Sequence, residues 1–256
     1  MAQFHDPLRQ IVSSFTTLCQ TLATATNGQF KRELDGTVLA VSGSSIATLN
    51  GLISPNLEPS PETIESLASD PSLSGVPWSI QLRGVPGQRV CDIASRFGLT
   101  MKSTTPLMVR RPDIKPPAES NTGLRVSPVE GDRLGLYVET LAEGFGVPAE
   151  AFKIFTEPSL AAKEGLTFYS AEVDGIAVGT GMAAISGDLL GVYNISVVPE
   201  HRQQGHGRTI TTEIIRAGYE VGATTAYLYS SDMGEPLYTS IGFRTEEIKT
   251  VFTKPE

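Results

Sequence analysis

The residues whose types and spacing most clearly indicate a chemical function lie between Val197 and Thr209, where the chain reads VVPEHRQQGHGRT. An apolar run ends in a proline, and a polar loop then leads to Gly205 and Gly207 at the start of a helical pattern. A helix N-terminus presents unpaired backbone N–H groups and a partial positive charge, and both attract an anion. Glycine lets the main chain approach a phosphate closely because it carries no Cβ. The segment therefore predicts a pyrophosphate site.

Two common nucleotide-binding loops do not fit this segment. A Walker A loop requires Lys-Ser/Thr after its last glycine, whereas Arg208 and Thr209 follow here with a different glycine spacing. A dinucleotide-binding fingerprint requires a third Gly or Ala where Ile210 stands. It also requires an acid at the end of the next strand, where the chain has Tyr229, Ser230 and Ser231 instead.

The remaining pattern, Arg202-x-x-Gly205-x-Gly207 directly after a Val-x-Pro strand end, resembles motif A of the GCN5-related N-acetyltransferase (GNAT) family. A second motif, from Pro236 to Phe243, resembles the helix-Tyr-x-x-x-Gly-Phe ending of the same family. The resemblance covers about residues 124–253. Two motifs in the right order and at the right separation make it specific.

The resemblance implies a binding site for acetyl-coenzyme A. In this family the loop holds the coenzyme pyrophosphate through backbone amides, a splayed strand end pairs with the pantetheine arm, and a polar residue after the next strand touches the pantetheine region. The backbone N–H of Val197 or Val198 is the expected donor to the thioester carbonyl. The coenzyme-binding residues carried over position by position are Ile195, Val197, Val198, Arg202, Gln203, Gln204, Gly205, His206, Gly207, Arg208, Thr209 and Ser231.

The resemblance also implies the catalytic candidates. The matching tyrosine, Tyr238, is expected to protonate the departing thiolate as a general acid. Asn194 is the second candidate, because it lies beside Tyr193 on the central strand, where some family members carry a carboxylate or histidine base. Neither side chain is itself a base. Deprotonation of the amine through water, with Glu172 or Asp174, is therefore the alternative.

The expected activity is acetyl transfer to a primary amine of a small molecule, by direct attack in a ternary complex. Proximity and orientation supply most of the acceleration in such a reaction, without a covalent enzyme intermediate. A protein N-terminus or lysine is the alternative acceptor. A coenzyme-A-binding sensor without turnover and a structural interaction module are the alternatives from other classes. Acceptor contacts are expected in residues 134–155. No metal is expected, because the three histidines lack ligand spacing with Cys, Asp or Glu.

Composition narrows the possible partners. The chain has 256 residues, of which 40% are hydrophobic, and 28 acidic against 20 basic residues give a net charge of −8. This excess of negative charge argues against nucleic acid and anionic membranes as partners. No uninterrupted apolar run approaches the length of a membrane span, and residues 1–6 lack signal-peptide features. We therefore expect a cytoplasmic monomer or homodimer, with Cys19 and Cys91 as buried, reduced thiols.

A proline-rich segment divides the sequence near its middle. Three prolines within residues 112–117 block helix formation and remove ladder donors. The prediction is a linker over residues 112–122, between an N-terminal domain at 1–111 and the catalytic acetyltransferase domain at 123–256.

The expected fold class is α/β with a mixed sheet, because strand and helix patterns alternate in both halves. An Asp-Gly pair at 174–175 predicts a β-hairpin. Gly144 and Gly146 are expected to end a helix that Asp132 caps. Helices are expected at 7–24, 61–68, 88–97, 132–143, 149–155, 205–221 and 235–240. Strands are expected at 37–41, 46–52, 78–82, 104–110, 124–126, 167–173, 176–185, 189–198, 225–229 and 243–253.

The two halves share an internal similarity. Residues 93–99 match residues 237–243 at a constant offset of 144, and a strand pattern follows each. This predicts a diverged duplication in which the N-terminal half is a degenerate GNAT-like domain. In that copy Tyr238 falls on Ala94, and prolines occupy the place of the glycine loop. An unrelated small α/β cap is the alternative.

Overall fold

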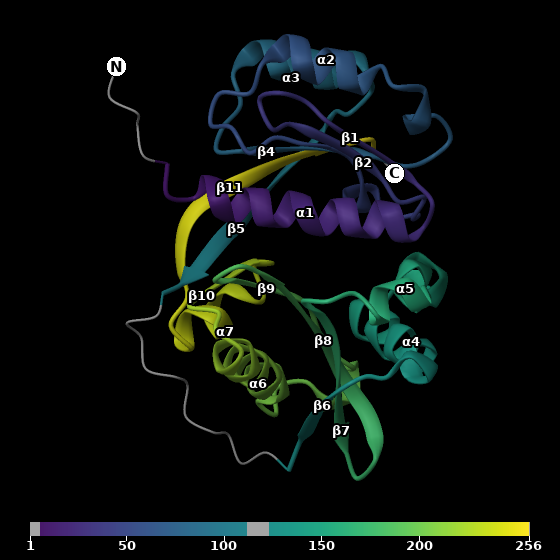
Figure 1. Cartoon of the computed structure of the whole chain (residues 1–256), viewed down its shortest axis with the longest axis vertical. Helices are drawn as coiled ribbons and strands as arrows, with labels where there is room; N and C mark the ends of the chain where they lie inside the picture. The colour runs from purple at the N-terminus through teal and green to yellow at the C-terminus, as the bar shows by residue number, and fades with distance from the viewer. Residues whose placement is uncertain (1–5, 112–122, 256) are drawn as a thin grey trace. The chain divides into compact units, whose positions relative to one another are not determined.

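The structure is a computed structural model that describes residues 6–111 and 123–255. Its chain forms two compact units, the first from residues 6–105 with 247–255 and the second from 106–111 with 123–246. Each unit consists of a mixed sheet with helices on its faces (Figure 1). The predicted fold class is therefore confirmed. None of the described helices is both long and apolar enough to cross a membrane.

The sheet of the first unit has the strand order β1-β2-β3-β4-β11. Strands β3 and β4 are parallel, and the other neighbours are antiparallel. The elements of this unit are α1 (Arg9–Ala25), β1 (Gln29–Arg32), β2 (Val38–Val41), η1 (Ala47–Leu49), β3 (Asn50–Ile53), α2 (Pro61–Ala68), η2 (Pro71–Leu73), β4 (Ser79–Arg83), α3 (Gln88–Arg96), the start of β5 (Met101–Arg110) and most of β11 (Arg244–Thr253).

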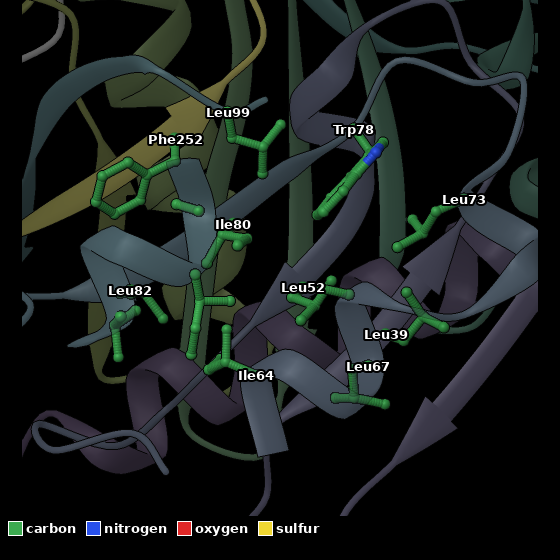
Figure 2. Packing of buried hydrophobic residues seen from close by; sticks show 14 of the residues in the cluster. Leu39, Leu52, Ile64, Leu67, Leu73, Trp78, Ile80, Leu82, Leu99 and Phe252 are labelled. Carbon is green, nitrogen blue, oxygen red and sulfur yellow. The ribbon is translucent and has the colours of Figure 1, made fainter. Parts of the chain in front are cut away.

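Side-chain alternation on these strands gives the first unit two apolar layers. Leu39 and Leu52 face one side of the sheet and pack with Ile64 of α2 and Ile93 of α3 (Figure 2). Their strand neighbours face the other side and pack with α1; they are Val38, Ala40 and Ile53. Because successive strand side chains point to opposite faces, a sheet covered on both sides buries every residue of such strands, as is seen in β2 and β3.

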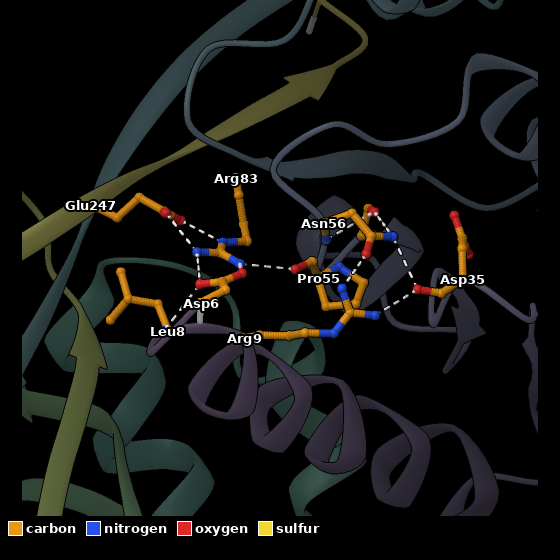
Figure 3. A network of polar contacts seen from close by, with 9 residues as sticks. Asp6, Leu8, Arg9, Asp35, Pro55, Asn56, Arg83 and Glu247 are labelled. Atoms are coloured by element: carbon orange, nitrogen blue, oxygen red, sulfur yellow. Dashed lines mark hydrogen bonds and ion pairs between the residues drawn. The ribbon is translucent and has the colours of Figure 1, made fainter. Parts of the chain in front are cut away.

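A buried arginine links the last strand of the first unit to its neighbours (Figure 3). Arg83 on β4 is 3% exposed and donates to Glu247 of β11 through Nε and Nη2, both at 2.8 Å. It also pairs with Asp6, at 2.9 Å from Nη2, and donates to the Pro55 carbonyl. The hydrogen bonds from Arg83 hold the pKa of Asp6 below its usual range. The burial of this cation is therefore compensated by two carboxylates.

The sheet of the second unit has the strand order β5-β10-β9-β8-β7-β6, in which only β9 and β10 are parallel. Helix α6 lies on one face of the sheet and α4 on the other (Figure 1). The isoleucines of α6 pack on the first face, and on the second the Tyr137 ring of α4 lies edge-on to Phe168. The elements are β6 (Arg125–Pro128), η3 (Gly131–Arg133), α4 (Leu134–Phe145), η4 (Ala149–Thr156), α5 (Pro158–Ala161), β7 (Leu166–Val173), β8 (Ile176–Ser186), β9 (Leu189–Val197), η5 (Pro199–His201), α6 (His206–Glu220), β10 (Thr225–Tyr229) and α7 (Glu235–Ser240).

The units differ from the predicted domain boundaries because two strands pair outside their own half of the sequence. The end of β5 pairs with β10 in the second unit, with Leu107 opposite Tyr229. The end of β11 pairs with β4 in the first unit, with Phe252 opposite Ile80. A division at the proline-rich segment, as predicted, would separate each of these strands from its partner. The predicted linker itself lies entirely outside the described residues.

Both units share one topology. In each unit, an antiparallel pair of strands is followed by two strands that lie parallel to each other and are joined by a helix. A second helix comes next, and the closing strand follows it. Helices α2 and α3 occupy the places of α6 and α7. This correspondence supports the predicted duplication.

Most predicted elements are present, and each of three differences has a physical cause. Residues 46–52 divide into η1 and β3, because the buried Asn50 amide bonds the backbone of Ser42, Gly43 and Ser44 and holds the chain in a turn. Strand β1 was not predicted, since its sequence is polar and its side chains are mostly exposed. Gly144 does not end α4, whose left-handed cap is Gly146. Both cysteines are free thiols, Cys19 buried and Cys91 half-buried.

Candidate functional site

A cleft opens where β9 and β10 stop pairing. Their ladder joins Leu189–Gly191 to Thr225–Tyr227, and beyond it residues from both strands line a cavity of about 510 Å³. Residues from α4, α6 and α7 complete its walls. The lining residues are Gly144, Phe145, Val192, Tyr193, Ile195, Ser196, Val197, Arg202, Gly207, Leu228, Tyr229, Ser231, Met233, Gly234, Leu237 and Tyr238.

A bulge in β9 shapes this opening. Asn194 has a φ of +53°, and the β8–β9 register shifts between Thr180 and Met182. Asparagine adopts this left-handed conformation more readily than most residues. The Asn194 carbonyl accepts a hydrogen bond from Thr180 Oγ1 at 2.9 Å, and its amide nitrogen donates to the Tyr137 hydroxyl at 3.0 Å. Asn194 thus fixes the bulge and is absent from the cleft lining.

One of the two candidate backbone donors is already used. The Val198 N–H donates to the Val178 carbonyl at 2.9 Å, so the pairing with β8 continues one residue past the end of β9. Successive N–H groups of a strand point to opposite edges. The Val197 N–H therefore points to the edge that faces the cleft, which Val197 also lines.

The predicted anion-binding loop has the expected backbone shape. Gln203 and Gly205 have left-handed φ values of +61° and +83°, and α6 begins at His206. Gly207 faces the cleft, where a Cβ would lie 3.2 Å from Leu237 and 4.0 Å from Val197. The loop therefore delivers a helix N-terminus to the end of the cleft, with little room for a side chain at Gly207.

Two arginines of the loop bond to neighbouring backbone and side-chain groups. Arg202 donates from Nε to the Val197 carbonyl at 3.1 Å and from Nη2 to the Gly144 carbonyl at 2.7 Å. It thereby connects the loop to β9 and to the end of α4. Arg208 donates to Ser240 Oγ at 2.7 Å, which links α6 to the end of α7.

The His206 imidazole lies beneath the loop. It is 4% exposed, and neither ring nitrogen has a hydrogen-bond partner among the described residues. Burial, together with the nearby His201, lowers the pKa of His206. A buried neutral ring leaves only the His206 backbone N–H for a ligand. The Thr209 hydroxyl donates to the Gly205 carbonyl within the helix.

Tyr238 reaches the cleft from α7. Its ring lies edge-on to Phe243, with 6.0 Å between centroids, and a Cβ at Gly234 would come within 2.7 Å of it. Burial raises the pKa of Tyr238 to about 12, so the phenol keeps its proton at neutral pH. Ser231, at the end of β10, accepts a hydrogen bond from Gly234 N–H and also lines the cleft.

Glu172 and Asp174 lie outside the cleft lining. Glu172 is 3% exposed and forms ion pairs with Arg125 and Arg133, whose hydrogen bonds lower its pKa. A carboxylate held by two guanidiniums is a weak base. Asp174 forms the β7–β8 turn with a φ of +50°.

The structure thus brings part of the predicted residue set to one cleft. The predicted residues that line it are Ile195, Val197, Arg202, Gly207, Ser231 and Tyr238. The others lie within β9, directly after it, in the loop or in α6; they are Asn194, Val198, Gln203, Gln204, Gly205, His206, Arg208 and Thr209. Sequence reasoning did not single out Phe145, Tyr229 and Met233, because their roles depend on where α4 and the end of β10 meet. Among the described residues, no His/Cys/Asp/Glu group could hold a metal ion.

Comparisons with known proteins agree with this geometry. Residues 164–245 match the family model described as an acetyltransferase (GNAT) domain. That segment contains the splayed strands, the loop and Tyr238. No sequence among the curated proteins matches the chain.

Solved structures extend the similarity along the chain. A GCN5-related N-acetyltransferase from Kribbella flavida aligns with a TM-score of 0.68 at 17% identity, over 98% of this chain and 96% of its own. A functionally unknown conserved protein from Staphylococcus epidermidis aligns with a TM-score of 0.64 at 14% identity, over 90% and 94%. A GCN5-related N-acetyltransferase from Sphaerobacter thermophilus gives 0.53 at 18% identity, over 70% and 60%.

The splayed parallel strands and the glycine loop define the class as a GNAT fold. The second unit contains a GNAT acetyltransferase domain, matched over residues 164–245, and the aligned solved structures share its fold. Members of this family use an acyl-coenzyme A. The residues around the cleft fit such a ligand, because they combine a helix N-terminus for phosphates with a free strand edge for an amide-bearing chain.

Proposed function

We propose that the chain is an acetyl-coenzyme-A-dependent N-acetyltransferase that acetylates a primary amine of a small molecule within a ternary complex. The observation that carries this proposal is the convergence of three groups on one cleft: the helix N-terminus at Gly207, the Val197 N–H and the Tyr238 hydroxyl. These groups match the pyrophosphate, the thioester carbonyl and the sulfur of one extended ligand.

In the proposed reaction the neutral amine attacks the thioester carbonyl carbon, forming a C–N bond. The Val197 N–H stabilises the oxyanion that develops. The C–S bond then breaks, and Tyr238 gives its proton to the leaving thiolate. Water accepts the proton lost by the nitrogen, since Asn194 is not a base and Glu172 is held by arginines. Tyr238 regains a proton from solvent.

We assign coenzyme binding to the second unit alone. In the first unit the corresponding helix, α2, begins with Pro61, which lacks an N–H group. The Ser60 hydroxyl already accepts a hydrogen bond from Thr63 N–H at 3.1 Å. The N-terminus of α2 is thus capped from within, as expected of a degenerate copy. Calorimetric titration should give one acetyl-coenzyme A per chain, and a stoichiometry of two would contradict this assignment.

Calorimetric titration of acetyl-coenzyme A into the wild type and Gly207→Trp tests the proposal. We expect micromolar binding by the wild type and a loss of at least 100-fold in Gly207→Trp, because an indole cannot fit beside Leu237 and Val197. Gly135→Trp is the matched control. Gly135 is exposed on α4, a Cβ at this position would have no neighbour within 4 Å, and the residue should tolerate the change.

The result also separates the alternative classes of function. Absence of binding by the wild type would remove the acetyltransferase interpretation. Tight binding without thiol release for any amine, peptide or protein acceptor would identify a coenzyme-A sensor instead.

A further inference from the structure

The cleft also carries aromatic side chains to which the coenzyme-binding proposal assigns no role. Phe145, Tyr193 and Tyr229 line it together with Val192, Leu228 and Met233. The side chain of Met233 is 86% exposed and that of Phe145 53% exposed. Exposed apolar side chains that gather at one concave site mark a binding surface.

The Tyr193 ring is held in one position. Its hydroxyl donates to the Tyr227 hydroxyl at 2.8 Å, and the two rings meet at 87°. The ring also lies over Gly191, where a Cβ would come within 2.5 Å of it. Gly191 therefore makes room for the ring, and the bond to buried Tyr227 fixes its direction. A rigid ring of this kind binds a flat group at low cost in conformational entropy.

Phe145 is positioned by the end of α4. The next residue, Gly146, adopts a left-handed φ of +69° and ends the helix, and the Phe145 ring packs edge-on against Phe152 with 5.5 Å between centroids. Half of the Phe145 side chain stays uncovered. This leaves an aromatic surface at the cleft that another aromatic group could cover.

The charge of the described lining is positive. Arg202 is its one formally charged side chain, and Asp and Glu do not occur in this described set. Arg202 remains cationic while it donates to two backbone carbonyls. A polycation that entered this cleft would lose water without meeting a carboxylate.

We infer that the acceptor is a monoamine whose nitrogen is carried by an aromatic or similarly bulky apolar group, bound between Phe145 and the fixed Tyr193 ring. The inference rests on the proposed acetyl transfer and deepens it. It separates this cleft from one that serves polyamines or aminoglycosides.

Steady-state kinetics with matched amines tests the inference, using thiol release as readout. Phenethylamine represents the apolar monoamines, and spermidine and an aminoglycoside represent the polycations. We expect kcat/KM for phenethylamine to exceed that for spermidine by at least 100-fold. Phe145→Ala should raise the KM for phenethylamine at least 10-fold with little change in kcat, whereas Phe145→Tyr should keep the wild-type KM. Leu136→Ala is the control, because Leu136 lies on the same helix, is 42% exposed and is outside the lining.

Calorimetry with acetyl-coenzyme A is run on each variant, so that failure of the proposed acceptor class can be distinguished from failure of the proposed acetyl transfer. Equal Kd values across the variants, with the KM effect confined to Phe145→Ala, support the inference. Turnover of spermidine or the aminoglycoside as efficient as that of phenethylamine overturns the acceptor class and leaves acetyl transfer intact. The acceptor class is also overturned by an unchanged KM in Phe145→Ala, or by coenzyme binding without thiol release when phenethylamine is the acceptor. Failure of the wild type to bind acetyl-coenzyme A overturns the proposed function itself.

Discussion

Tyr238 is the residue whose proposed role depends most on a single atom. The phenol lines the cleft from α7, and its ring is fixed against Phe243. Tyr238→Phe removes the transferable proton and keeps the ring. We expect kcat to fall by about 10²–10⁴-fold, the usual contribution of a general acid. The Kd for acetyl-coenzyme A should stay within about twofold. An unchanged kcat would show that water protonates the thiolate.

The pH profile follows from the same side chain. A general acid works only while protonated, and burial raises the pKa of Tyr238 to about 12. The alkaline loss of kcat from this group should therefore begin only above about pH 10. Measuring kcat from pH 7 to 10 at saturating amine tests this expectation. A decline centred near pH 8 to 9 would assign the acid role to another group.

At this scale the sequence predicted backbone geometry better than side-chain contacts. Gly207 and Tyr238 could be placed because a glycine loop and a helix-Tyr-x-x-x-Gly-Phe ending are local patterns. The choice of Val197 over Val198 needed the β8–β9 register, which depends on residues far away in the chain. The buried environment of His206 was equally hidden, since burial is a property of packing.

Among the elements, β6 and η3 depend on one carboxylate of β7. Arg125 comes from β6 and Arg133 from η3, and both bind Glu172. Glu172→Gln should lower the free energy of unfolding by about 1.5–3 kcal/mol, the range for hydrogen bonds to charged groups. Urea denaturation at pH 7 measures this change. Asp174→Asn, at the exposed turn that follows β7, is the control and should be neutral.

Acidification should remove the same contribution. The two arginines lower the folded-state pKa of Glu172 below its ordinary value of 4.5. Its stabilising effect is therefore fully present above pH 4.5 and is lost as the pH falls through the folded-state pKa. The difference between the wild type and Glu172→Gln should shrink in this acidic range. A difference that stays constant down to pH 3 would contradict the ion-pair account.

Element positions were largely predictable, because helix and strand periods differ and because glycine, proline and Asp-Gly pairs mark the ends. The exceptions have non-local causes. Gly144 reads as a helix stop, yet it lies inside α4, where a Cβ would come within 1.8 Å of Ser196 Oγ. Asn50 breaks a predicted strand through bonds to a neighbouring loop. Neither contact leaves a periodic signal in the sequence.

In the whole molecule, each half of the sequence supplies one strand that pairs with a strand from the other half. We call this arrangement strand exchange, and it makes each half depend on the other. Leu107, Met108 and Val109 of β5 are at most 1% exposed and pair along β10. Burying three such side chains contributes about 5–9 kcal/mol, comparable to the total stability of a domain. Residues 123–256 expressed alone lack this strand and should be insoluble or unfolded by circular dichroism. Residues 1–111 lack β11 and should behave likewise.

Co-expression provides the complementary measurement. Both fragments together should yield a soluble, folded complex, because each supplies the strand that the other half lacks. A stably folded 123–256 fragment would contradict this dependence. It would also support the predicted domain boundary. The sequence placed that boundary at the prolines because composition marks linkers and carries no information on which strands pair.

During synthesis, the strand exchange fixes the order in which strands can pair. Strand β10 finds its partner β5 already made when it leaves the ribosome. Strand β4 must wait for β11, since 164 residues separate Arg83 from Glu247. At about 5–20 residues per second, that delay lasts roughly 10–30 s. Throughout it, one edge of the nascent first sheet stays open and Arg83 lacks one of its two carboxylates. Chaperones that protect open strand edges would find their binding site on this chain there, until the last residues of β11 emerge.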